Sequence, residues 1–228
     1  MDASNEIGIT ARKTGLILLA IAVALTIAHV AAMVIWYRDL LPIDEWLYFS
    51  FFDLDEEESI GTWYSALILF GAGRLALLQS RYARSGSQGW YSWWLLMAIG
   101  FHLLSLDEVA GFHEFVNTMV EDTHWTTYGA AIALVVAVAY LPFLWSLPVR
   151  TRWLFVISGC IYIGGAVGVE WATIWYEDND QLNTLAYNLW TAVEEFMEMA
   201  GVVLFIYALL GHIAANPKTT FIKYRFGP

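Results

Sequence analysis

The sequence predicts an all-α integral membrane protein that consists of one bundle of about six transmembrane helices. Of its 228 residues, 59% are hydrophobic and only 14% are charged, whereas about a quarter of the residues in a soluble domain are charged. Several apolar runs reach about 20 residues, the length that crosses a hydrocarbon core of about 30 Å. Because these runs are continuously apolar, without alternation of polar and apolar residues, a membrane β-barrel is excluded.

Six such runs follow one another along the chain, and we expect spans at residues 15–36, 59–79, 90–109, 126–147, 153–175 and 184–212. The first run is too long for the apolar region of a signal peptide and lacks a clear cleavage site, so we expect it to remain in the protein. The third and sixth helices are expected to extend beyond the hydrocarbon. Because the connections are short, residues 1–228 are predicted to form a single domain.

The distribution of charged residues predicts the orientation of the bundle. If the N-terminus is cytoplasmic, nearly all lysines and arginines fall in or near the inner loops, and only Arg38 lies on the outer side. The positive-inside rule therefore places both termini in the cytoplasm. Of the acidic residues in loops and termini, only Asp2 and Glu6 lie on the inner side. We interpret the acidic outer loops mainly as a solvated face that also concentrates cations.

Other features of the sequence exclude several classes of protein. Cys160 is the only cysteine, so the chain forms no internal disulfide and holds no cysteine-based metal motif, and we expect this residue to pack in the core. The sequence contains no phosphate-binding P-loop, serine-hydrolase nucleophile motif or dinucleotide fingerprint. A retinal protein is excluded because no span carries a lysine at mid-depth. We expect the lipid bilayer as a partner, leave other membrane subunits open, and predict no nucleic-acid partner.

The most informative residues are ionisable side chains inside or beside the spans, because such groups are costly in a membrane and usually mark a functional site. They are His102, Asp107, Glu108, Glu170, Glu194, Glu195 and Glu198, with Glu58, His113 and Glu114 at the edges of the spans. At a rise of about 1.5 Å per residue, those inside the spans fall in one layer of the outer half of the bilayer. Glu198 follows Glu194 by four residues and Glu195 by three, so it neighbours both on one helical face.

We therefore expect a shared site in the outer leaflet that binds a divalent metal ion. Carboxylates gathered in a medium of low dielectric constant cannot all stay ionised, and no lysine or arginine lies at their depth to neutralise them. Carboxylates with one or two imidazoles suit Fe, Mn or Zn. The first expected ligands are Glu108, Glu170, Glu195 and Glu198, and the next, as ligands or as residues that orient them, are Asp107, His113 and Glu58.

The same residues leave other functions open. If the protein is an enzyme, we expect a metal-dependent oxidase or hydrolase that acts on a lipid-soluble or periplasmic substrate, although no catalytic residue can be named. The alternatives are a cation- or proton-coupled transporter and a non-catalytic subunit of a larger membrane complex. The acids could also be protonated pairs that hold helices together. His102 could be a core histidine with satisfied hydrogen bonds, and His113 and Glu114 could lie in water.

Four segments carry a resemblance to a known family. They are ESIGTWYS at 58–65, LSLDE at 104–108 with HE at 113–114, GAVGVE at 165–170, and EEFMEMAG at 194–201. In these segments the chain resembles a family of uncharacterised bacterial multipass membrane proteins. The resemblance implies a multi-pass protein of the bacterial inner membrane, whose polar positions belong to one family pattern, and it brings no activity with it.

Overall fold

The computed structural model describes residues 10–42, 51–56, 58–85, 89–112, 115 and 124–215. Within this part of the chain all regular structure is helical. The elements are α1 (Ala11–Tyr37), α3 (Ile60–Ser85), α4 (Tyr91–Ala110), α6 (Trp125–Ser146), α7 (Val149–Ile163), the π-helix η1 (Gly164–Val169), α8 (Glu170–Asp178) and α9 (Leu185–Ala214).

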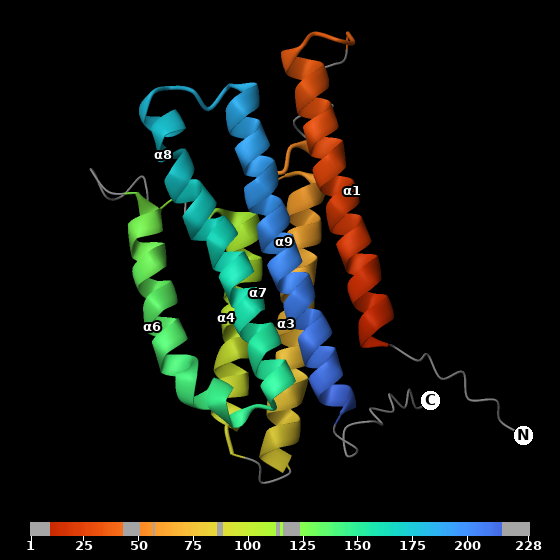
Figure 1. The fold of residues 1–228 in the computed structure, drawn as a ribbon, viewed down its shortest axis with the longest axis vertical. Helices are drawn as coiled ribbons and strands as arrows, with labels where there is room; N and C mark the ends of the chain where they lie inside the picture. The colour runs from red at the N-terminus through yellow and green to blue at the C-terminus, as the bar shows by residue number, and fades with distance from the viewer. Residues whose placement is uncertain are drawn as a thin grey trace, which may run out of the picture.

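These elements form six helices that are long and apolar enough to cross a membrane, because α7, η1 and α8 join into one helix from Val149 to Asp178. The predicted all-helical fold with six membrane-length helices is confirmed at this level, and each predicted span lies within a few residues of a helix. The six helices run side by side, and α1 begins at the same end of the bundle at which α9 ends (Figure 1).

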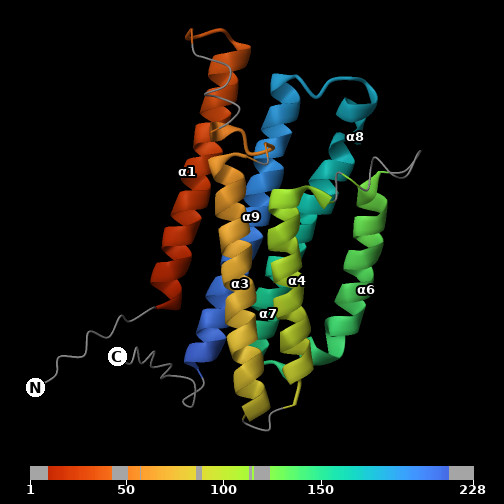
Figure 2. The same ribbon diagram turned by 180° about the vertical axis from the view of Figure 1, so that it is seen from behind.

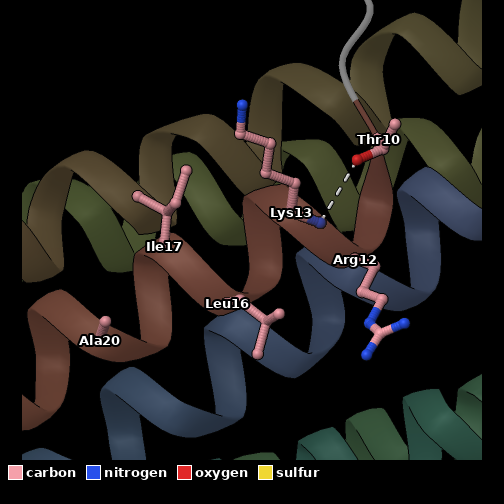
Figure 3. A pocket seen from close by; sticks show the side chains of 6 residues that line it. All are labelled: Thr10, Arg12, Lys13, Leu16, Ile17 and Ala20. Carbon is pink, nitrogen blue, oxygen red and sulfur yellow. Dashed lines mark hydrogen bonds between the residues drawn. The ribbon is translucent and has the colours of Figure 1, made fainter.

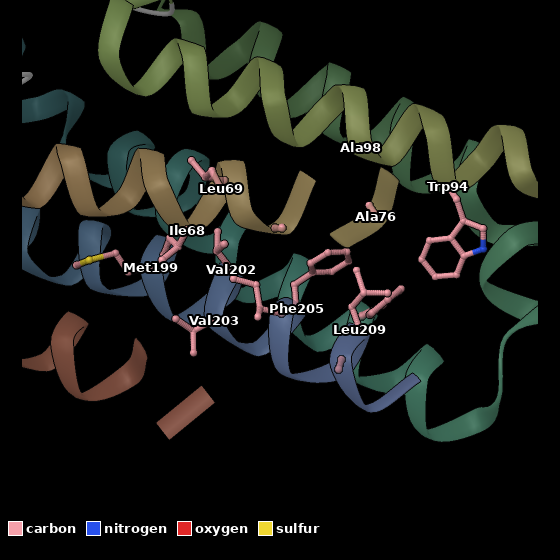
Figure 4. Packing of buried hydrophobic residues seen from close by; sticks show 14 of the residues in the cluster. Ile68, Leu69, Ala76, Trp94, Ala98, Met199, Val202, Val203, Phe205 and Leu209 are labelled. Carbon is pink, nitrogen blue, oxygen red and sulfur yellow. The ribbon is translucent and has the colours of Figure 1, made fainter. Parts of the chain in front are cut away.

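Helix α9 is the central element of the bundle. It contacts α1, α3, α7, η1 and α8, while α3 makes its largest contact with α4 (Figure 2). The buried face of α9 repeats at helical spacing, through Met199, Val202, Phe205 and Leu209. These side chains pack against α3 and α4 in one apolar core (Figure 4), whose labelled members from those helices are Ile68, Leu69, Ala76, Trp94 and Ala98.

The contact between α7 and α9 depends on small residues. A Cβ atom added at Gly201 of α9 would lie 2.9 Å from the backbone nitrogen of Tyr162 and 3.0 Å from the carbonyl oxygen of Ser158. The Ser158 hydroxyl donates to the carbonyl of Gly201 across the same contact at 2.8 Å. Small residues that allow two backbones to approach, supported by an interhelical hydrogen bond, are typical of helix packing in membranes.

Cys160 does not pack in the core as the sequence predicts, because it is exposed on α7. The face of α7 that meets α9 is formed by Phe155, Ser158 and Tyr162, which recur every three to four residues. Cys160 lies between two of these positions and therefore points away from α9. Its neighbour Gly159 also faces open space, since an added Cβ would meet no atom within 4 Å.

Helix α6 lies at the edge of the bundle and is fixed mainly near its ends. Close to its C-terminus, the fully buried ring of Phe143 packs among Trp90, Trp93 and Trp94. Arg152 of α7 donates to three backbone carbonyls at this end, those of Leu144, Trp145 and Leu147. The middle of α6 is exposed and apolar, with Leu134 and Val135 each about two-thirds exposed, as expected of a helix that faces lipid.

Candidate carboxylate site

The glutamates of α9 form the centre of the candidate site. Glu194, Glu195 and Glu198 are half-buried on this central helix. The negative charges of Glu198 and Glu194 are among those that repel a charge on Glu195. This agrees with their close spacing along the helix. Three carboxyl groups are thus gathered within about one helical turn.

Two further helices bring their acids to this centre. Glu108 of α4 acts on both Glu195 and Glu198, while Glu170, the first residue of α8, acts on both Glu194 and Glu198. Glu198 therefore interacts electrostatically with each of the other three first predicted ligands, Glu108, Glu170 and Glu195. We call these four residues and Glu194 the carboxylate cluster.

Tyr162 of α7 joins the carboxylate cluster, which the sequence alone does not indicate. The charged groups that act most strongly on its hydroxyl are Glu198, Glu108 and Glu195, which places this hydroxyl beside the acids. The side chain is held there because Gly201 lets the backbone of α9 approach Tyr162. Tyr162 is one of 12 tyrosines in the chain, and nothing in its local sequence separates it from the tyrosines that only pack.

The π-helix η1 brings the fifth span onto the carboxylate cluster. A Cβ atom added at Gly165 would lie 2.8 Å from the carbonyl oxygen of Glu194 and 3.1 Å from Cγ of Glu198. The missing side chain at Gly165 therefore lets η1 lie directly against the part of α9 that carries the acids. Single π-helical turns inside α-helices occur frequently at functional sites, and Glu170 follows this one directly.

Trp125, the first residue of α6, is hydrogen-bonded to Glu170. Its indole nitrogen Nε1 donates to Oε1 of Glu170 at 2.5 Å. The indole lies along its own helix, because an added Cβ at Gly129 would meet the ring at 2.5 Å. Trp125 is one of 12 tryptophans in the chain, and the structure gives it a specific partner on α8.

We expect Trp125→Phe to weaken the attachment of α6 to α8. Phenylalanine keeps an aromatic ring against Gly129 but has no N–H group to donate to Glu170, so we expect a loss of about 1 kcal/mol in stability. The measurement is the apparent melting temperature of the purified variant in detergent. Trp171→Phe is the matched control, because Trp171 is on α8 and 70% exposed. An equal shift in both variants would show that the Trp125–Glu170 bond contributes nothing of its own.

A second polar network joins α1, α9 and the segment that precedes α3. His29 is fully buried; its Nε2 is 2.9 Å from the carbonyl oxygen of Asn188, and its Nδ1 is 3.1 Å from the backbone nitrogen of Leu54. Since a carbonyl only accepts and an amide N–H only donates, the ring is neutral and carries its proton on Nε2. The network fixes the segment that bears Asp55, an exposed acid that acts on Glu194 and Glu195.

Asp53 lies in this network and is buried. Burial is the main cause that raises the pKa of Asp53 to about 6, and the nearby charge of Glu56 adds to it, although the N–H of Asp55 acts in the opposite direction. Oδ1 of Asp53 lies 3.5 Å from Nδ1 of His29. That nitrogen already accepts the Leu54 N–H and has no proton to share, so the carboxylate gains no ion pair from the neutral ring.

This arrangement makes stability depend on pH. The stabilising contribution of the protonated Asp53 side chain is fully present below the unfolded pKa of 3.8 and is lost as the pH rises through about 6. We therefore expect Asp53→Asn, which cannot ionise, to be more stable than the wild type above pH 7, by on the order of 3 kcal/mol. Near pH 4 the two proteins should be equally stable. Melting curves of both proteins between pH 4 and pH 8 would test this, and parallel curves would contradict it.

The other residues that the sequence singles out fall outside the carboxylate cluster or outside the described residues. Asp107 is half-buried on α4, and Glu58 is exposed just before α3. His113 and Glu114 lie outside the described part of the chain. His102 donates from Nδ1 to the carbonyl of Ala98 at 2.6 Å and packs against Gly73 of α3, so it has the contacts of a satisfied core histidine.

The arrangement of the carboxylates limits how they could bind a metal. Within the described residues, no group of three or more His, Cys, Asp or Glu side chains is placed to hold one ion. Ligation by the cluster would therefore require its flexible glutamate side chains to change rotamer. The carboxylate cluster and the neighbouring Tyr162 offer only oxygen atoms. Among the metals expected from the sequence, oxygen ligands suit Mn better than Zn or Fe.

Comparison with known families identifies the family of this chain. The sequence matches the family described as "Domain of unknown function (DUF8692)" over residues 18–213. The chain belongs to the DUF8692 family. The description of DUF8692 assigns no function, which agrees with the resemblance to an uncharacterised family. No curated protein and no solved structure matches the chain. The DUF8692 match includes every residue of the carboxylate cluster and begins after Arg12 and Lys13.

Proposed function

We propose that the carboxylate cluster is the functional centre of a multi-pass membrane protein and that it binds a divalent cation. The observation that carries this proposal is that glutamates of α4 and α8 lie near those of α9, and that only acids are among the charged groups that act most strongly on the three glutamates of α9. Such a group requires compensating positive charge, either from protons or from a cation. A divalent metal supplies that charge at one point and uses several carboxylates at once.

The outer side of the membrane is the proposed entry for the cation. The distribution of lysine and arginine supports cytoplasmic termini and a bacterial inner-membrane location, which would place the carboxylate cluster in the outer half. Exposed Asp55 acts on Glu194 and Glu195, so acids lead from the surface toward Glu198. A periplasm-specific reporter inserted near Asp178 should be active, while one fused after Pro228 should be silent. The reverse result would overturn the orientation.

The proposal of a bound metal is tested on purified wild-type protein. We expect elemental analysis to find about one divalent metal ion per chain, most readily Mn. Because a ligand that binds only the folded protein stabilises it, a strong chelator should lower the melting temperature and added Mn²⁺ should restore it. If the protein contains no metal and the chelator changes nothing, the metal proposal fails.

The second candidate is a cluster that holds protons. The observation that favours it is that, within the described residues, no group of three or more His, Cys, Asp or Glu side chains is placed to hold one metal ion. In this case protonated carboxyls would join α4, α8 and α9 by hydrogen bonds. A metal-free protein whose stability is unchanged by chelator would support it. The wider role of the protein depends on whether the cluster holds a metal ion or protons. The proposals are a metal-dependent oxidase or hydrolase, a coupled transporter and a non-catalytic subunit.

A further inference from the structure

The N-terminal end of α1 carries an open groove that is separate from the carboxylate cluster. Its volume is about 370 Å³, and Figure 3 shows the side chains that line it: Thr10, Arg12, Lys13, Leu16, Ile17 and Ala20. One end of the groove is cationic and the rest is apolar. The two kinds of side chain are therefore separated along the helix axis, as in a surface that fits an amphipathic molecule.

Helical spacing produces this separation. Arg12, Leu16 and Ala20 follow one another at intervals of four residues, so they form one column on the helix surface. Lys13 and Ile17 form the adjacent column in the same way (Figure 3). Leu16 is 57% exposed and Ile17 is 49% exposed. Each column thus begins with a cation and continues with apolar side chains that no other helix covers.

The side chains of Arg12 and Lys13 are both exposed. Within the described residues, neither Arg12 nor Lys13 forms an ion pair, and Thr10 caps the helix by accepting the backbone N–H of Lys13 at 3.4 Å. Other arginines at this end of the bundle have partners in the protein. Arg150 donates to the hydroxyl of Tyr207 at 2.6 Å, and Arg152 donates to backbone carbonyls at the end of α6.

We propose that this groove binds the headgroup and the upper acyl chain of an anionic phospholipid. The phosphate would lie between Arg12 and Lys13, where the positive end of the helix dipole also favours an anion. The acyl chain would follow Leu16 and Ile17 toward Ala20, about 10 Å along the axis from Lys13, which is within the length of one leaflet of about 15 Å. The small side chain of Ala20 leaves room for the chain. The headgroup of such a lipid has a net negative charge, which the two cations attract, whereas a zwitterionic headgroup has no net charge.

The test is native mass spectrometry of the purified full-length protein, titrated with phosphatidylglycerol and, separately, with phosphatidylcholine. We expect phosphatidylglycerol to bind with higher affinity. Arg12→Gln and Lys13→Gln should each weaken that binding by about five-fold, and the double variant should bind the two lipids alike. Arg81→Gln is the matched control, because it removes an exposed cation from α3 and leaves the groove unchanged.

A variant that fills the groove separates a specific site from general attraction to a charged surface. Ala20→Trp keeps both cations and adds bulk where the acyl chain is expected, on a face of α1 that is exposed. We expect it to weaken the binding of phosphatidylglycerol as well. If Ala20→Trp binds like the wild type, or if Arg81→Gln weakens binding as much as Arg12→Gln, the proposed lipid site is wrong.

Discussion

Replacing Glu195 and Glu198 together by glutamine is expected to reduce the metal content of the protein from about one ion per chain to nearly none. Glutamine keeps the shape of each side chain but removes the negative charge that holds the cation. The variant should also lose the stabilisation that Mn²⁺ gives the wild type, which is about 2.7 kcal/mol when the free ion is at 100 times its dissociation constant. Elemental analysis and melting curves with added Mn²⁺ would measure both effects.

The matched control for this experiment is Glu56→Gln. Glu56 is an exposed acid in the segment before α3, so this variant changes the net charge without touching the carboxylate cluster, and its metal content should equal that of the wild type. The double variant also separates the two proposed functions. A protonated glutamate and a glutamine are similar in shape and polarity, so in the proton-holding case the double variant should remain as stable as the wild type, with or without chelator.

Replacing Gly201 by alanine is expected to destabilise the whole bundle. The added Cβ would meet backbone atoms of α7 at 2.9 and 3.0 Å, and backbone atoms cannot move aside as the end of a side chain can. We expect a loss of about 1 to 3 kcal/mol, together with a weaker Ser158–Gly201 hydrogen bond. Gly201→Leu should cost more and should fail to give a folded protein. The apparent melting temperature in detergent measures the effect.

Gly159→Ala provides the control on the partner helix. A Cβ at Gly159 would meet no atom within 4 Å, so alanine can be accommodated without strain. Because alanine favours the helix over glycine, this variant should be neutral or slightly more stable, by at most about 1 kcal/mol. A comparable loss of stability in both variants would show that α7 and α9 do not approach each other at Gly201 in the way described.

The six membrane-length helices could be predicted from the sequence because their signal is local. Each is a continuous apolar run whose length matches the hydrocarbon, and its ends coincide with polar residues or prolines. The exposed position of Cys160 could not be predicted in this way. The residues on both sides of Cys160 in α7 are mostly apolar, so the run itself does not show which side meets α9 and which side is exposed.

The candidate site could be predicted in part for the same physical reason. Glutamates inside apolar runs stand out because burying a carboxylate is costly, and those of α4, α8 and α9 do lie near one another. Trp125 and Tyr162 could not be found, because an aromatic residue in a membrane helix is ordinary until its partner is known. Trp125 donates a hydrogen bond from α6 to Glu170, and the Tyr162 hydroxyl of α7 lies near Glu198; both partners are far away in sequence.

The π-helix η1 decides which way Glu170 faces. In an unbroken α-helix, Glu170 would follow Tyr162 by eight residues and lie about 80° from it around the axis. A π-helical turn absorbs about one additional residue, which reduces the offset to about 20° in the opposite sense and returns Glu170 to the side of Tyr162. Deleting one residue from Gly164–Val169 would allow a regular α-helix with Glu170 seven residues from Tyr162, about 20° from it around the axis, so Glu170 would still face the carboxylate cluster. The π-helical turn thus lets the fifth span carry one residue more than a regular α-helix would and still present Glu170 to the same side of the bundle as Tyr162.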